Sequence, residues 1–210
     1  LYNVGVDALI VQDMELLKMD LPPIALHAST QCDTRTVEKV KFLEQCGFEQ
    51  VVLARETSLD TMRQMAEQTN VVLEAFVHGA LCVSYSGQCY LSQALCQRSA
   101  NRGACAQLCR LPYDLVDARG QKILQNKHLL SLKDMDRSNY LWQMAQAGVT
   151  SFKIEGRLKD VNYVKNVVSY YRQKLDQIML EHPHLTPASC GKVTHFFEPC
   201  PAKTFHRGQT

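Results

Sequence analysis

The sequence predicts an α/β fold: a parallel (β/α) barrel-like domain, an incomplete TIM-type barrel, with an irregular cysteine-rich loop and a small hairpin inserted in it. Short apolar runs alternate with stretches of helical periodicity, and this alternation is typical of parallel sheets because a parallel crossover needs a helix. The alternation stops between residues 78 and 111, which hold five cysteines and three glycines. This interruption predicts the inserted loop.

Six short apolar segments are the strand candidates, because helical stretches or turn residues bound each of them. They are residues 8–11, 24–27, 50–54, 71–77, 128–132 and 151–155. We expect these strands to run parallel, each followed by a helix except where the cysteine-rich loop intervenes. A closed barrel has eight strands, so six predict a partial barrel unless further strands precede them. An open doubly wound sheet is the alternative, weakened because no Gly-x-Gly-x-x-Gly follows an early strand.

Capping residues and glycines set the expected ends of the helices. The expected helices run from Asp33 to Cys46, from Ser58 onwards, from Asp134 to Ala147 before Gly148, and over residues 160–181. Residues 113–116 and 122–124 flank a turn around Gly120 and predict the hairpin. These elements predict one catalytic domain over residues 1–181, including the loop at 78–111, and a linker or the start of a C-terminal region over 182–210.

The composition fits a globular chain with a hydrophobic core. Apolar residues make up 46% and charged residues 21% of the 210 positions, which excludes a disordered or collagen-like chain. The net charge of +2 does not predict strong attraction to nucleic acid but leaves room for a local basic groove. No apolar run approaches the roughly 20 residues of a membrane helix, and no secretory signal opens the chain. We expect a cytoplasmic protein without a membrane partner, and a piece of a longer chain.

The cysteines are the sharpest signal for chemistry. Five of them lie within 28 positions: Cys82, Cys89, Cys96, Cys105 and Cys109. The total of nine is odd, which fits a closed disulfide framework poorly and favours metal or redox chemistry. Four thiolates suit an iron–sulfur cluster or tetrahedral zinc, and the single tight Cys-x₃-Cys pair favours the cluster. The alternative is a set of buried free cysteines that act as small apolar residues.

Polar side chains at the ends of the expected strands predict a site. The C-terminal ends of parallel strands open on one face, so residues far apart in the chain would meet there. We expect one cavity beside the cysteine-rich loop, surrounded by His27, Arg55, Glu56, His78, Lys153, Glu155 and Arg157. The guanidinium groups of Arg55 and Arg157 would suit a carboxylate or a phosphate.

Four blocks resemble the signature of a collagenase-like peptidase family of unknown catalytic type. The most specific covers residues 74–82 and 86–89, and the others cover residues 27–31, 101–110 and 151–157. The resemblance spans about residues 5–181 and continues into 203–208. That last block and residues 130–134 are most similar to the branch that hydroxylates a cytidine of large-subunit ribosomal RNA.

The resemblance implies a barrel-like domain that hydroxylates its substrate without molecular oxygen. It also implies a 4Fe–4S cluster, with ligands at Cys82, Cys89 and Cys105. In one related pattern the fourth ligand falls near Met135, where this chain has no cysteine, and Cys109 is our choice from another pattern. Prephenate is implied as a small carboxylate co-substrate, and ribosomal RNA or its precursor as the partner.

Three functions follow from these features. In the first, an RNA hydroxylase, Glu155, Lys153 and His78 are the expected catalytic residues, and His27, Arg55, Glu56 and Arg157 bind substrate. The substrate is a ribosomal cytidine or, as in a sister branch, a tRNA uridine. The second is a peptidase, which would need Cys82 activated beside His78. The third is a zinc-stapled RNA-binding module without catalysis. The first accounts for the cysteine-rich loop most directly.

Overall fold

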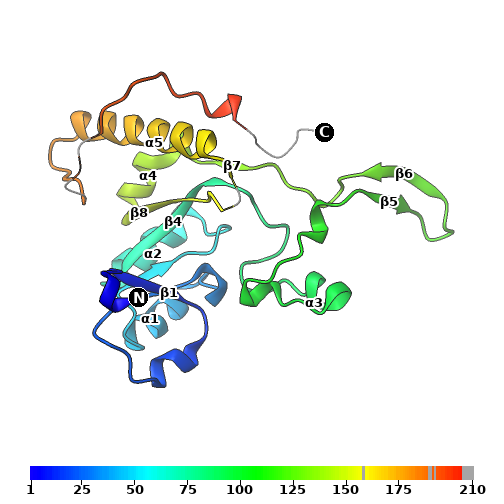
Figure 1. Cartoon of the computed structure of the whole chain (residues 1–210), viewed down its shortest axis with the longest axis horizontal. Coiled ribbons are helices and arrows are strands. Elements are labelled where there is room, and N and C mark those ends of the chain that lie inside the picture. The colour runs from blue at the N-terminus through cyan, green and yellow to red at the C-terminus, as the bar shows by residue number, and fades with distance from the viewer. Residues whose placement is uncertain (158, 189–190, 192, 205–210) are drawn as a thin grey trace.

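Five parallel strands form one sheet whose order follows the chain, β1-β2-β3-β4-β8 (Figure 1). The structure, a computed structural model, describes residues 1–157, 159–188, 191 and 193–204. The strands are β1 (Ala8–Val11), β2 (Ala25–Ala28), β3 (Gln50–Val52), β4 (Val72–Gly79) and β8 (Val149–Ile154). This sequential order is that of a (β/α) barrel, whereas a doubly wound sheet reverses its order. Within the described ranges β1 does not pair with β8, so the sheet is an open arc.

Four helices of the described chain lie on one face of the sheet, and those between successive strands do so because the crossovers are right-handed. They are α1 (Val37–Gln45), α2 (Leu59–Gln68), α4 (Leu141–Gln146) and α5 (Val161–Glu181). Alternate side chains of β4, Leu73, Ala75 and Val77, pack with these helices in the main core. Glu74 and Phe76 therefore belong to the opposite face.

The first crossover differs from the expectation that a helix follows each strand. Only a 3-10 turn, Met14–Lys18, lies between β1 and β2. The predicted start of the next helix is also wrong. Asp33 has a left-handed backbone, with φ of 57°, and ends the 3-10 turn Thr30–Cys32. The Thr36 hydroxyl caps α1 instead, accepting the Lys39 N–H at 3.3 Å. Ser58 caps α2 as expected.

The predicted strand at residues 128–132 is wrong. This segment is an exposed connection, with Leu129 and Leu130 facing solvent, and the sheet instead gains β7 (Met135–Asp136). β7 pairs antiparallel with the end of β4, where β4 extends beyond β3. An apolar run of this length predicts a buried strand, and periodicity alone does not distinguish a buried run from an exposed one. Asp134 is likewise not a helix cap, since it forms a buried ion pair with Lys159 at 3.4 Å.

The insertion between β4 and β7 has the two predicted parts. The cysteine-rich loop contains one short helix, α3 (Leu91–Cys96), and the hairpin consists of β5 (Tyr113–Val116) and β6 (Lys122–Lys127). The hairpin projects away from the sheet (Figure 1), and all residues of β6 are exposed. None of the helices in the described part of the chain is long and apolar enough to cross a membrane.

The segment after α5 runs back along that helix. The backbone N–H of Cys200 donates to Asn166, and Ser169 Oγ lies 3.0 Å from His195 Nδ1. Residues 205–208 of the last resembling block lie outside the described residues. The predicted boundary at residue 181 coincides with the end of α5 and remains a prediction as a domain boundary.

Candidate functional site

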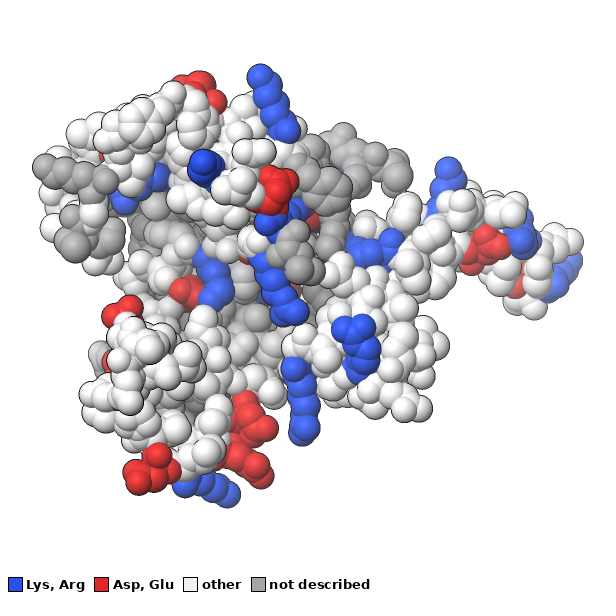
Figure 2. Space-filling view, in the orientation of Figure 1, with Lys and Arg blue, Asp and Glu red and all other residues white. Residues whose placement is uncertain are grey.

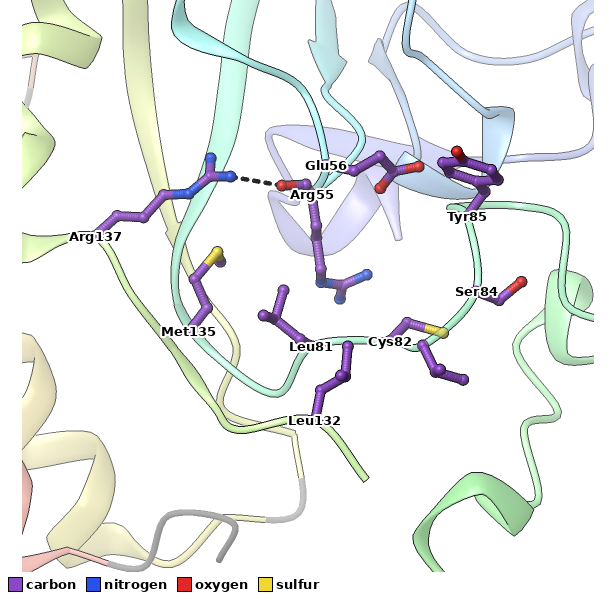
Figure 3. A pocket seen from close by; sticks show the side chains of 10 residues that line it. Arg55, Glu56, Leu81, Cys82, Ser84, Tyr85, Leu132, Met135 and Arg137 are labelled. Carbon is purple, nitrogen blue, oxygen red and sulfur yellow. Dashed lines mark hydrogen bonds between the residues drawn. The ribbon is translucent and has the colours of Figure 1, made fainter. Parts of the chain in front are cut away.

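A cavity of about 750 Å³ lies between the strand ends and the cysteine-rich loop (Figure 3). Its lining combines two arginines and a carboxylate with apolar side chains and a thiol: Arg55, Glu56, Leu81, Cys82, Val83, Ser84, Tyr85, Leu132, Met135 and Arg137. This volume suits a small molecule or one nucleotide. The expected cavity therefore exists, but only Arg55 and Glu56 of the seven predicted residues line it.

Arg55 extends into the cavity from the end of β3. Its Nη2 is paired with the carboxylate of Glu155, the residue that follows β8. The guanidinium also lies 4.1 Å from the centre of the Phe76 ring. Glu155 thus reaches the site through its ion pair with Arg55. The charge of Arg55 is already balanced within the protein.

Glu56 fastens the cysteine-rich loop to the strand ends. Its carboxylate accepts the Ser86 backbone N–H at 3.0 Å and the Ser86 hydroxyl at 3.1 Å. The next residue, Gly87, donates its N–H to the Gln31 side chain at 3.0 Å. These contacts hold the segment that carries Cys82 and Cys89 against β2 and β3, so Glu56 has a structural role in addition to lining the cavity.

Gly87 makes a close approach that no other residue can make. Its φ is 76°, and a Cβ there would lie 2.5 Å from the Gln31 carbonyl oxygen. Gly103 is a matched control, since its φ is 83° but nothing lies within 4 Å of its Cβ position. We expect Gly87→Ala to lower the free energy of unfolding by roughly 1–3 kcal/mol more than Gly103→Ala, because only the former adds a backbone collision. Urea denaturation of both variants measures this, and equal losses would show that the loop moves freely.

Arg137 is the charged residue of the cavity lining that the sequence did not predict. It directly follows β7, and its backbone N–H donates to the Val77 carbonyl at 2.8 Å. Its Nη2 donates to the Arg55 carbonyl at 2.6 Å, as the dashed line in Figure 3 shows. A strand at β7 would place Arg137 at the cavity, because β7 pairs with the end of β4. The sequence instead predicts the strand at residues 128–132, and Arg137 then falls within the helix expected after it.

His78 was expected at the cavity, but the structure places it elsewhere. A bulge in the pairing of β4 with β8 falls between Phe76 and His78, and a bulge redirects the side chains that follow it. His78 is buried, with Nδ1 3.2 Å from the Tyr171 hydroxyl and its ring near Tyr163. It therefore packs beneath α5 instead of lining the cavity.

The other three predicted residues also lie outside the lining. Lys153 Nζ pairs with Glu74 Oε1 at 2.6 Å, on the sheet face opposite the helices. His27 lies in β2, opposite Gln50 of β3. Arg157 is exposed. Lys153 and His27 lie within strands, so they are nearer the middle of the sheet than the cavity, which lies at the strand ends.

The four predicted ligand cysteines share one neighbourhood. Burial raises the pKa of Cys109, and the nearby thiols of Cys82, Cys105 and Cys89 raise it further, while Arg110 acts in the opposite direction. Cys82 also lines the cavity. Among the described residues no three potential ligands already have metal-binding geometry. The thiols therefore lie near one another without forming a closed ligand set.

Further hydrogen bonds in the cysteine-rich loop contact one of these sulfurs and fix the loop in place. The Gln107 backbone N–H donates to Cys105 Sγ at 3.3 Å, a bond that also stabilises a thiolate. Arg110 ties the loop to the segments on either side of the cavity, donating to the carbonyls of Leu81 and Leu132, the latter at 2.9 Å. Cys96 is the exception, since it ends α3 and does not contribute to the pKa of Cys109.

Comparison with known proteins finds relatives that are named as RNA-hydroxylation proteins and as a collagenase. It is 59% identical over all 210 residues to the 23S rRNA 5-hydroxycytidine C2501 synthase of Escherichia coli K12, covering 32% of that protein. It is 37% identical over 183 residues to tRNA hydroxylation protein P1 of Bacillus subtilis 168, covering 83% of this chain and 43% of that one. A collagenase of Porphyromonas gingivalis W83 is 37% identical over 166 residues, covering 73% and 40%.

The chain spans about a third of the length of the Escherichia coli relative and less than half of the other two. The family model for peptidase family U32 matches residues 1–210, the whole of the chain. The expected resemblance to a collagenase-like peptidase family is thereby confirmed. The chain belongs to peptidase family U32.

Proposed function

We propose that the protein containing this chain is an RNA-modifying enzyme that hydroxylates a cytidine of 23S ribosomal RNA. This proposal rests on one observation: over all 210 residues, the chain is 59% identical to the Escherichia coli 23S rRNA 5-hydroxycytidine C2501 synthase. Identity to the tRNA hydroxylation protein and to the collagenase is 37% over shorter segments. The partner would be ribosomal RNA or its precursor, and the enzyme would act in the cytoplasm.

The reaction requires a redox centre and a source of oxygen. Replacing a C–H bond of the base with C–OH removes two electrons from the substrate, so an oxidant must take them up and an oxygen atom must be supplied. We assign the redox role to a 4Fe–4S cluster held by Cys82, Cys89, Cys105 and Cys109, which when bound accepts and donates single electrons. A small hydroxylated carboxylate such as prephenate is the proposed co-substrate: it would give up its hydroxyl oxygen and take up the two electrons as its own C–OH bond is replaced by C–H. Zinc at the same residues would supply no electron transfer.

The position of the cysteines supports a cluster in this role. Cys82 belongs both to the four-thiol group and to the lining of the cavity, so a cluster bound there would adjoin a substrate in the cavity. Burial raises the pKa of Cys109, so deprotonating its thiol requires a strong partner, and iron or another metal would provide it. Within the site, Glu155 orients Arg55 and is the proposed proton acceptor.

The surface also suits an RNA partner. On the face in Figure 2, basic side chains lie along the middle of the molecule, the projecting hairpin carries both basic and acidic side chains, and several acidic ones lie near α1 and the N-terminus. Arg119, Lys122 and Lys127 of the hairpin are exposed. Together with the basic side chains along the middle of the molecule, they provide the local basic surface that the small net charge left open.

A peptidase finds less support in the site. The nucleophile would be Cys82, and its expected base, His78, is buried against Tyr171 and does not line the cavity. A thiol attacks efficiently only when a base or a positive charge stabilises its thiolate. The collagenase relative keeps the peptidase as the second candidate.

A segment exchange tests the proposal in a complete enzyme. In the Escherichia coli synthase, the segment aligned to this chain is replaced by these 210 residues, and the chimera is expressed in a strain that lacks the native enzyme. We expect mass spectrometry to find 5-hydroxycytidine restored in the 23S rRNA. A chimera with the aligned segment of the Bacillus subtilis protein is the control and should not restore it. An abundant, soluble chimera carrying this chain without the modification would contradict the proposal.

A further inference from the structure

We propose that Arg137 is the anion-binding residue of the cavity and that it holds the phosphate of a nucleotide whose base enters the cavity. This inference rests on the proposed function, because it takes RNA to be the substrate. It assigns a role to a residue that neither the strand-end pattern nor the resemblance indicated.

The two arginines of the cavity differ in their charge balance. Arg55 is paired with Glu155 and stacked on Phe76. Arg137 is half-buried, and within the described ranges no carboxylate pairs with it. Burial lowers its pKa, with no acidic neighbour acting against that effect. An anion that enters the cavity would therefore stabilise the Arg137 guanidinium more than the Arg55 guanidinium, whose charge is already balanced.

The structure holds Arg137 in place before any ligand binds. Its backbone N–H is bonded to Val77, and its Nη2 to the Arg55 carbonyl. The preceding residue, Asp136, accepts the Tyr171 hydroxyl at 3.0 Å and the Ser138 N–H at 2.9 Å, which fixes β7 from its other side. A guanidinium has five N–H donors, and the described contacts use one of them. The remaining donors can form the paired bonds that an oxyanion accepts.

The rest of the lining fits a nucleotide better than an isolated anion. The apolar side chains Leu81, Val83, Leu132 and Met135 form much of the wall. The volume of about 750 Å³ far exceeds the needs of a phosphate or a small carboxylate alone. Enzymes that act on a base extrude the nucleotide into such a pocket, and its phosphate accompanies it. Cys82 in the same wall places the base next to the proposed cluster.

The phosphate is tested by comparing cytidine 5′-monophosphate with cytidine on the full-length protein. Calorimetric titration of Arg137→Ala should show affinity for the monophosphate reduced by about 10- to 100-fold, as for loss of charge-assisted hydrogen bonds, and affinity for cytidine unchanged. Arg63→Ala, which removes an exposed arginine of α2, is the matched control and should bind both as the unmutated protein does. Arg137→Lys keeps the charge but loses the paired geometry, so its loss should be intermediate.

Three results would overturn the inference. Equal losses for both ligands would mean that the substitution merely collapses the cavity, and circular dichroism with Arg137→Lys separates that case from misfolding. Failure of the unmutated protein to bind the monophosphate would rule out a nucleotide as the ligand of the cavity. A loss seen with malonate but not with the monophosphate would make this a site for a small carboxylate. If the segment exchange fails while binding still depends on Arg137, the nucleotide site stands and the RNA is a different one.

Discussion

Serine in place of Cys82, Cys89, Cys105 or Cys109 is expected to remove most of the iron and sulfide from the full-length protein purified without oxygen. Each iron of a 4Fe–4S cluster takes one thiolate from the protein, and a serine hydroxyl is a much poorer ligand. RNA hydroxylation should be lost together with the cluster. Iron and acid-labile sulfide analysis, with the visible absorption spectrum, measures the first effect.

Cys96→Ser is the matched control for these four substitutions. Cys96 is an exposed cysteine of the same loop, but it lies at the end of α3 and does not contribute to the pKa of Cys109. We expect this variant to retain its iron and its activity. Full iron content in all four single variants would refute the ligand assignment. Zinc without iron in the unmutated protein would instead identify a structural metal site.

The fold was largely predictable because the buried strands carry their own signal. Residues 50–54 and 71–77 combine apolar runs with flanking helix caps, and the structure places β3 and β4 there. The wrong strand predictions concern segments whose burial does not follow from their hydrophobicity. Residues 128–132 are apolar but exposed, and the two residues of β7 are too few to show any period. β7 is a strand because it pairs with the end of β4, and its own two residues carry no strand pattern.

The candidate site was predictable as a location and less so as a set of residues. The rule that parallel strands open on one face placed the cavity correctly and brought Arg55 and Glu56 to it. The same rule misplaced His78, because a bulge at the end of β4 changes which face the side chain joins. Arg137 directly follows an antiparallel strand, β7, to which the rule does not apply.

Replacing Glu74 should lower the stability of the protein, because it leaves the Lys153 ammonium group without its carboxylate partner. The Glu74 carboxylate accepts Lys153 Nζ and Ser151 Oγ, both at 2.6 Å, and Gln50 Nε2 at 2.8 Å. Its side chain is 11% exposed and that of Lys153 is 27% exposed. We expect Glu74→Leu to lower the free energy of unfolding by about 1–3 kcal/mol, less than for a fully buried pair because water still reaches the ammonium group. Denaturation of the full-length protein in urea measures it.

The double variant Glu74→Leu with Lys153→Met should recover most of that loss, because an apolar pair of similar size removes both desolvated charges. Lys153→Met alone should cost less than Glu74→Leu, since Ser151 and Gln50 still donate to the carboxylate. Purely additive effects would mean that the pair is not coupled. The same variants decide whether Lys153 is catalytic, as the sequence suggested. If the stable double variant still hydroxylates RNA, the role of Lys153 is structural, whereas loss of activity in Lys153→Met at full stability would return Lys153 to the reaction.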